Sequence, residues 1–172
     1  HPNAMLAACY TDLIARSGLD PAVVEDLVIG CTAPFGEQSR NIGRNAWLQA
    51  GYPAEVPATT LDRRCGSAQT SVNFAAALVA SGVHDVVIAG GVEHMGHVPM
   101  NSPAKISELY GEPWPAELRA RYDFVTQGES AELIAERWDI SRTEMDEFAV
   151  RSHALATDAI EAGRFVDEMV QM

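Results

Sequence analysis

The chain has 172 residues, of which 47% are hydrophobic and 21% are charged, and its formal net charge at pH 7 is −12. This composition is typical of a folded globular protein, and the acidic balance argues against a nucleic-acid partner, because phosphate binding needs a basic face. The longest apolar run, residues 74–80, is too short to cross a bilayer, so we expect no membrane insertion. Three cysteines without a CxxC pair predict free thiols in a reducing, cytoplasmic compartment.

Helical and strand-like patterns alternate through the first half of the chain. Apolar residues at helical spacing predict helices over 4–17, 39–50 and about 68–82, and short apolar runs predict strands over 27–31, 56–63 and 85–90. This alternation predicts an α/β fold with βαβ units, a parallel sheet and helices on both faces. Three strands are few for such a sheet, so the sheet is expected to be incomplete in this chain.

The pattern changes at about residue 97. Residues 97–125 are rich in proline and glycine and carry scattered aromatic side chains, which the packing of a small domain would explain. Two helices are predicted after them, over 128–138 and 141–163, each preceded by a capping box: Thr126 with Glu129, and Ser141 with Glu144. We interpret 97–165 as an insertion and 166–172 as the beginning of another strand.

Cys65 is the candidate nucleophile, because it lies where a predicted strand meets a predicted helix. Unpaired N–H groups at a helix amino terminus favour a thiolate, so we expect a lowered pKa. Arg63 and Arg64 would point to opposite faces of a strand, so at most one is expected near the sulfur. Gly66 allows a substrate to approach the backbone, and the Cys65 amide N–H can donate to an oxyanion. The alternative is that Cys65 is a small buried hydrophobic residue.

The segment DRRCGSAQTSVNFAAALVASGVHDVVIAGGVEHM, residues 62–95, resembles the nucleophile region of the thiolase family. In that family a strand delivers Cys-Gly-Ser to a helix start, and the next strand ends in Gly-Gly-Xaa-Glu-Xaa-Met. The flanking stretches GLDPAVVEDLVIGC, NIGRNAWLQAGYP and SRTEMDEFAVRSHALATDAIEAGRFVDEMV are also similar to the amino-terminal half of a thiolase. The resemblance covers essentially the whole chain.

The resemblance implies an acyl-CoA acyltransferase that interconverts a 3-ketoacyl-CoA plus CoA with acetyl-CoA plus a shortened acyl-CoA. Cys65 would carry the acyl group as a thioester, with its own N–H in an oxyanion hole, coenzyme A as a substrate, no covalently bound cofactor and no metal. The implied fold is a layered half-domain over 1–96 that lacks its first strand (central in the family's sheet), a loop domain over 97–165, and a return strand beginning in 166–172. Family members form homodimers or homotetramers.

Two departures from the family pattern bear on function. Many thiolases carry His-Met-Gly beside the bound pantetheine, and the matching residues here are Thr126, Gln127 and Gly128, of which Gln127 and Gly128 are expected to bind substrate. The family's histidine base and second cysteine lie in its carboxy-terminal half, beyond Met172, so the 172-residue chain alone is expected to be inactive. A ketoacyl synthase-type condensing enzyme and a non-catalytic module that binds lipid or acyl-CoA remain alternatives.

Other reactive side chains are expected to have structural roles. Cys9 and Cys31 fall on apolar stretches and are predicted to lie in the core. His94 and His97 are three residues apart, as metal ligands can be, but no further ligands cluster nearby. Glu93 is predicted to be a buried carboxylate bonded to backbone at a strand end, rather than a general base.

Overall fold

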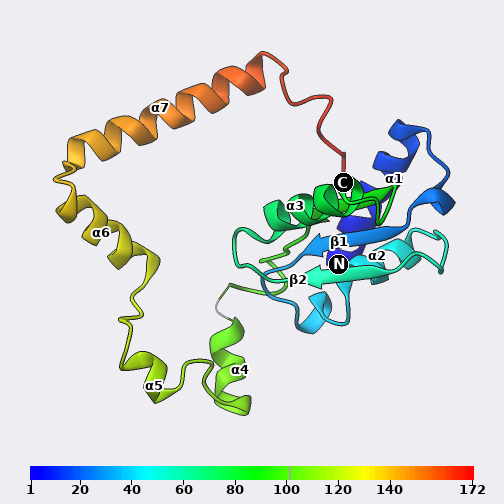
Figure 1. Cartoon of the computed structure of the whole chain (residues 1–172). Coiled ribbons are helices and arrows are strands. Elements are labelled where there is room, and N and C mark those ends of the chain that lie inside the picture. The colour runs from blue at the N-terminus through cyan, green and yellow to red at the C-terminus, as the bar shows by residue number, and fades with distance from the viewer. Residues whose placement is uncertain (101) are drawn as a thin grey trace. The chain divides into compact units, whose positions relative to one another are not determined.

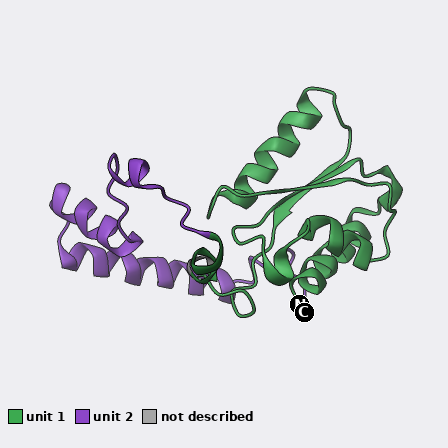
Figure 2. Cartoon of the chain, turned by 90° about the horizontal axis from the view of Figure 1, so that it is seen from below, with its two compact units in different colours: residues 1–110, 172 green, residues 111–171 purple. Residues whose placement is uncertain are grey.

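The computed structural model describes residues 1–100 and 102–172, which form two compact units (Figures 1 and 2). The first unit contains residues 1–110 and 172, and the second contains residues 111–171. The interpretation of residues 97–165 as an inserted domain stays a prediction.

All of the helices and strands predicted before residue 92 are present in the first unit. In chain order it contains α1 (Pro2–Ser17), the short 3-10 helix η1 (Pro21–Val23), β1 (Asp26–Gly30), the 3-10 helix η2 (Gly36–Gln38), α2 (Ile42–Gln49), β2 (Ala58–Leu61), α3 (Ser67–Ala80), β3 (Val87–Gly91) and α4 (Ser102–Tyr110). Helix α2 begins later than predicted, because Arg40 and Asn41 have φ angles of 57° and 63°, in the left-handed region. The Asn41 side chain then caps the helix by accepting from the Arg44 N–H at 3.4 Å.

The sheet has three parallel strands in the order β2-β1-β3, which confirms the predicted parallel arrangement (Figure 1). In β1, Leu27 pairs with Ala58 of β2 on one side and with Ile88 of β3 on the other. β1 is therefore the central strand of this three-stranded sheet, and both of its edges are paired. A further strand could pair only at the outer edge of β2 or of β3.

Helices α2 and α3 cover opposite faces of the sheet. A Cβ atom on Gly43 of α2 would lie 2.7 Å from Ile29, and a Cβ atom on Gly30 would lie 2.5 Å from Ser67 of α3. Because Ile29 and Gly30 are neighbours in β1, their substituents point to opposite faces. The central strand is therefore covered on both sides, as its continuous apolar run predicts.

The core lies on the face of the sheet against which α1 and α2 pack. Tyr10 of α1 and Trp47 of α2 meet there edge to face, with ring centroids 5.6 Å apart, and the Trp47 indole N–H donates to the Pro53 carbonyl at 2.9 Å. Cys31 is buried, which confirms its predicted place, whereas Cys9 is only half-buried.

The second unit is helical, with α5 (Ala116–Arg119), α6 (Gln127–Arg137) and α7 (Arg142–Glu161). Both predicted capping boxes are present, at the starts of α6 and α7. The sequence predicted neither α5 nor, in the first unit, α4. Residues 166–172 contain no strand, and their assignment to a return strand stays a prediction. In the described ranges, 1–100 and 102–172, we find no helix with the length and apolar character that a membrane span requires.

Candidate active site

Three loops meet at the carboxyl edge of the sheet, because parallel strands all end at the same edge. Thr32 follows β1, Arg64 follows β2 and Glu93 follows β3. The Thr32 hydroxyl donates to the Arg64 carbonyl at 3.2 Å, and the Thr32 N–H donates to the Glu93 carboxylate at 2.7 Å. Thr32 thus joins the ends of all three strands, a role that sequence reasoning missed; the available signal was a hydroxyl residue directly after a buried strand.

Cys65 lies at this edge and is exposed, so the structure contradicts the alternative of a buried hydrophobic residue. It lies two residues before Ser67, the first residue of α3, and directly before Gly66, the N-cap of that helix. The expectation that Arg63 and Arg64 lie in a strand is wrong, since β2 ends at Leu61.

A tight turn carries the cysteine. The Asp62 carboxylate accepts from the Arg64 N–H at 2.7 Å and also lies 3.6 Å from the Arg64 guanidinium. The Ser67 hydroxyl accepts from the Arg63 N–H at 2.9 Å and donates to the Arg64 carbonyl at 2.6 Å. The Cys65 amide N–H, by contrast, donates to no acceptor within the part of the chain that the structure describes.

Two glycines allow the start of α3 to sit directly on the sheet. A Cβ atom on Gly30, the last residue of β1, would lie 2.5 Å from the Ser67 carbonyl carbon. A Cβ atom on Gly91, the last residue of β3, would lie 2.8 Å from the Ala68 Cβ atom. Real Cβ atoms do not approach other atoms so closely, so both positions require glycine to hold the cysteine turn at the sheet edge. Gly91 belongs to the Gly-Gly-Xaa-Glu-Xaa-Met motif, but sequence analysis assigned a packing role to neither glycine.

Glu93 is bonded to backbone at a strand end, as the sequence predicted, but it is half-buried rather than buried, and buried Gln38 holds it. The Gln38 amide nitrogen donates to Glu93 at 2.6 Å and to the Ala33 carbonyl at 2.8 Å, while its oxygen accepts from the His94 N–H at 2.7 Å. Burial, together with the nearby Glu93 charge, raises the pKa of Cys31 to about 11, so this thiol stays protonated at neutral pH.

The two histidines contact each other. The His94 and His97 rings are tilted by 35° with centroids 4.1 Å apart, and His97 Nδ1 lies 2.8 Å from the Glu37 carboxylate. The His94 Nδ1 atom accepts from the His97 N–H at 3.2 Å. Across residues 1–100 and 102–172, no group of three or more histidine, cysteine, aspartate or glutamate side chains is placed to hold a metal ion.

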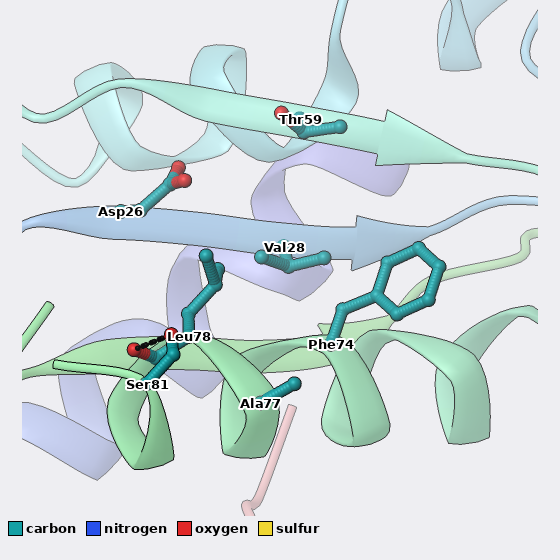
Figure 3. Close-up of a pocket in the computed structure, with 7 residues that line it drawn as sticks. All are labelled: Asp26, Val28, Thr59, Phe74, Ala77, Leu78 and Ser81. Atoms are coloured by element: carbon teal, nitrogen blue, oxygen red, sulfur yellow. Dashed lines mark hydrogen bonds between the residues drawn. The ribbon is translucent and has the colours of Figure 1, made fainter. Parts of the chain in front are cut away.

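A groove of about 440 Å³ lies between the sheet and α3 (Figure 3). Its lining is mostly apolar and consists of Asp26, Val28, Thr59, Phe74, Ala77, Leu78 and Ser81. Cys65 does not line this groove, so the groove is separate from the cysteine turn.

The predicted substrate residues of the loop domain begin a helix of the second unit. Gln127 is the first residue and Gly128 the second residue of α6, directly after the Thr126 cap. Their relation to Cys65 stays a prediction.

Comparison with known proteins gives consistent matches over the whole chain. Residues 1–172 match the family model described as the amino-terminal domain of thiolase. The chain is 39% identical to the steroid 3-ketoacyl-CoA thiolase FadA6 of Mycobacterium tuberculosis, over 99% of this chain and 43% of that protein. It is 41% identical to the 3-ketoacyl-CoA thiolase of Saccharophagus degradans, over 95% of this chain and 41% of that protein.

Among solved structures, the chain is similar to the acetyl-CoA acetyltransferase of Bacillus anthracis, with a TM-score of 0.79 and 30% identity. The match covers 98% of this chain and 44% of that one. The chain therefore spans less than half the length of the relatives that it matches.

Proposed function

The chain belongs to the thiolase family, and from this premise we propose that the protein containing it is an acyl-CoA C-acyltransferase that cleaves or forms 3-ketoacyl-CoA. The observation that carries the proposal is the exposed Cys65 thiol at the carboxyl edge of the sheet, next to its own unpaired amide N–H. A nucleophile and an oxyanion donor within one residue suit acyl transfer through a thioester.

In the cleavage direction, the Cys65 thiolate attacks the 3-keto carbon of the substrate, and the carbonyl oxygen becomes an oxyanion that the Cys65 N–H stabilises. The bond between C2 and C3 then breaks, the acyl group stays on sulfur, and the leaving enolate of acetyl-CoA takes up a proton. The thiol of a second CoA molecule gives up its proton and attacks the thioester, which releases the shortened acyl-CoA and restores the thiolate. In the family these proton transfers involve a histidine and a second cysteine of the carboxy-terminal half.

Substrate contacts, assembly and compartment complete the proposal. Coenzyme A acts as a substrate, with no covalently bound cofactor, and Gln127 and Gly128 contact its acyl or pantetheine portion. Their place at the start of α6 supports this role, because the first amides of a helix are unpaired donors. We also propose that the protein is cytoplasmic, given its free cysteines, and forms a homodimer or homotetramer, as the family resemblance implies.

One other function from a different class is a non-catalytic module that binds lipid or acyl-CoA. The exposed thiol and its unpaired amide favour catalysis, since binding alone needs neither. The condensing ketoacyl synthase alternative is disfavoured by the family match over residues 1–172.

The proposal is tested by trapping the thioester. The full natural polypeptide that contains these residues is incubated with acetyl-CoA, and its intact mass is measured. We expect an increase of one acetyl group, which is absent in Cys65→Ala and retained in the matched control Cys9→Ala. An adduct that survives Cys65→Ala, or no adduct on the unmodified protein, would contradict the proposal.

A further inference from the structure

The carbonyl of Arg64 is held by three hydrogen-bond donors. It accepts from the Ser67 hydroxyl at 2.6 Å, the Ser67 N–H at 3.0 Å and the Thr32 hydroxyl at 3.2 Å. This carbonyl belongs to the same peptide unit as the Cys65 N–H. In a planar trans peptide the C=O and N–H bonds point in opposite directions, so the donors that fix the carbonyl also fix the direction of the N–H.

We propose that Thr32 and Ser67 are positioning residues for acyl transfer, because their hydroxyls orient the Arg64–Cys65 peptide so that its N–H meets the oxyanion. This inference rests on the proposed function. A carbonyl that accepts hydrogen bonds also makes the N–H of its own peptide unit a better donor, because successive dipoles polarise one another. The two hydroxyls therefore orient and strengthen the donor without touching the substrate.

The backbone at Arg64 needs such support. Its φ angle is 51°, in the left-handed region that residues with a side chain rarely adopt. The Asp62 carboxylate holds the Arg64 N–H, and the two hydroxyls hold the Arg64 carbonyl, so both sides of the strained residue are fixed. Without the hydroxyls, the peptide unit would have less to prevent its rotation away from this orientation.

The Thr32 hydroxyl is itself carried on a rigid base. The Thr32 N–H is bonded to Glu93, and Glu93 is bonded to Gln38, which is fully buried. The direction of the proposed oxyanion donor thus depends on contacts from the ends of β1, β2 and β3 together. The bonds from Thr32 to Arg64, from Gln38 to Glu93 and from Thr32 to Glu93 join residues 32, 55 and 61 positions apart, whereas the bonds of Ser67 are local.

The test compares two reactions of the same sulfur in the full natural polypeptide. Acylation by acetyl-CoA develops an oxyanion, whereas alkylation by iodoacetamide displaces iodide and develops none on a carbonyl. We expect Thr32→Val to slow acylation of Cys65 about tenfold and Ser67→Ala to slow it at least as much, because a displaced oxyanion donor loses its stabilisation. Alkylation of Cys65 should change by no more than about twofold, since it needs no oxyanion donor.

Two further variants serve as controls. Thr32→Ser keeps the hydroxyl and should restore acylation to within about threefold of the unmodified protein. Thr60→Val removes a hydroxyl from β2 that bonds to the Asn41 side chain at 3.0 Å, away from the cysteine turn, and should leave both rates unchanged.

The outcomes separate this inference from the proposed function. Failure of the unmodified protein to form an adduct overturns the proposed function and, with it, the positioning role. Normal acylation of both Thr32→Val and Ser67→Ala overturns the positioning role alone. An equal fall in the rates of acylation and alkylation of Cys65 would also overturn the positioning role, and so would alkylation of buried Cys31 in the variants. Either result would mean that the two hydroxyls only stabilise the folded turn.

Discussion

Replacing Gly30 by alanine should push the start of α3 away from the sheet. The added Cβ atom would lie 2.5 Å from the Ser67 carbonyl carbon, 2.6 Å from the Ala68 nitrogen and 2.7 Å from the Ser67 Cβ atom. All three belong to the first turn of the helix, and two are backbone atoms, so no side-chain rotation relieves the contact. Restoring ordinary contact distances requires a shift of roughly 1 Å.

The cost follows from overpacking a close-packed site. Forcing an extra methyl group into such a site costs about 1–3 kcal/mol, which outweighs the gain of about 0.4–1 kcal/mol that alanine brings by restricting the unfolded chain. Gly90→Ala is the matched control, because its Cβ atom would meet nothing within 4 Å and its φ angle is not positive. We expect Gly30→Ala to be about 2 kcal/mol less stable than Gly90→Ala.

Urea unfolding of the 172-residue chain, followed by circular dichroism, measures this difference. With a denaturant dependence of about 2 kcal/mol per molar urea, the midpoint of Gly30→Ala should fall about 1 M below that of Gly90→Ala. Equal midpoints for the two variants would refute the argument that α3 requires a glycine at the end of β1.

Three further predictions concern the hydrogen bonds of Gln38, the cap of α7 and the thiol of Cys31. Gln38→Leu should lower the free energy of unfolding by about 2–4 kcal/mol, because it leaves three polar partners of Gln38 unpaired. In the same urea titration, Gln69→Leu, a substitution at an exposed position, should change the free energy of unfolding by less than about 0.5 kcal/mol. The backbone N–H and the hydroxyl of Ser141, the cap of α7, hold the pKa of Glu144 below its ordinary value of 4.5. The capping box therefore stabilises the helix above that pH, and this stabilisation is lost as pH falls through the lowered pKa. In strong acid, the helix content of a peptide of residues 139–163, measured by circular dichroism, should equal that of its Glu144→Ala variant, and a difference that persists there would contradict this prediction. Because the pKa of Cys31 is raised to about 11, iodoacetamide at pH 8 should modify Cys31 at least about 100-fold more slowly than exposed Cys65. Mass analysis of peptides measures the two rates, and rapid modification of Cys31 in the folded chain would contradict its burial.

Local pattern was sufficient for much of the fold. Apolar spacing predicted α1, α2, α3 and all three strands of the sheet, and the hydroxyl–glutamate spacing predicted both capping boxes. These signals are local, because helix and strand periods and caps involve residues only a few positions apart. Helices α4 and α5 escaped prediction, since α5 has only four residues and α4 lies in a stretch without clear helical spacing.

The sequence also singled out Cys65, and the structure places it, exposed, at the carboxyl edge of the sheet. Its immediate surroundings were less predictable. The turn that replaces the expected strand at Arg64 depends on bonds from Asp62 and Ser67, which local alternation does not reveal.

By itself, the sequence determined the alternation of helices and strands, the family and the identity of the candidate nucleophile. Only the tertiary structure decided which loops surround that nucleophile. Thr32 reaches the Arg64 carbonyl, and Glu93 reaches Thr32, because β1 pairs with both β2 and β3. These contacts join residues 32 and 61 positions apart, and such pairs meet through strand order and register rather than through any short-range pattern.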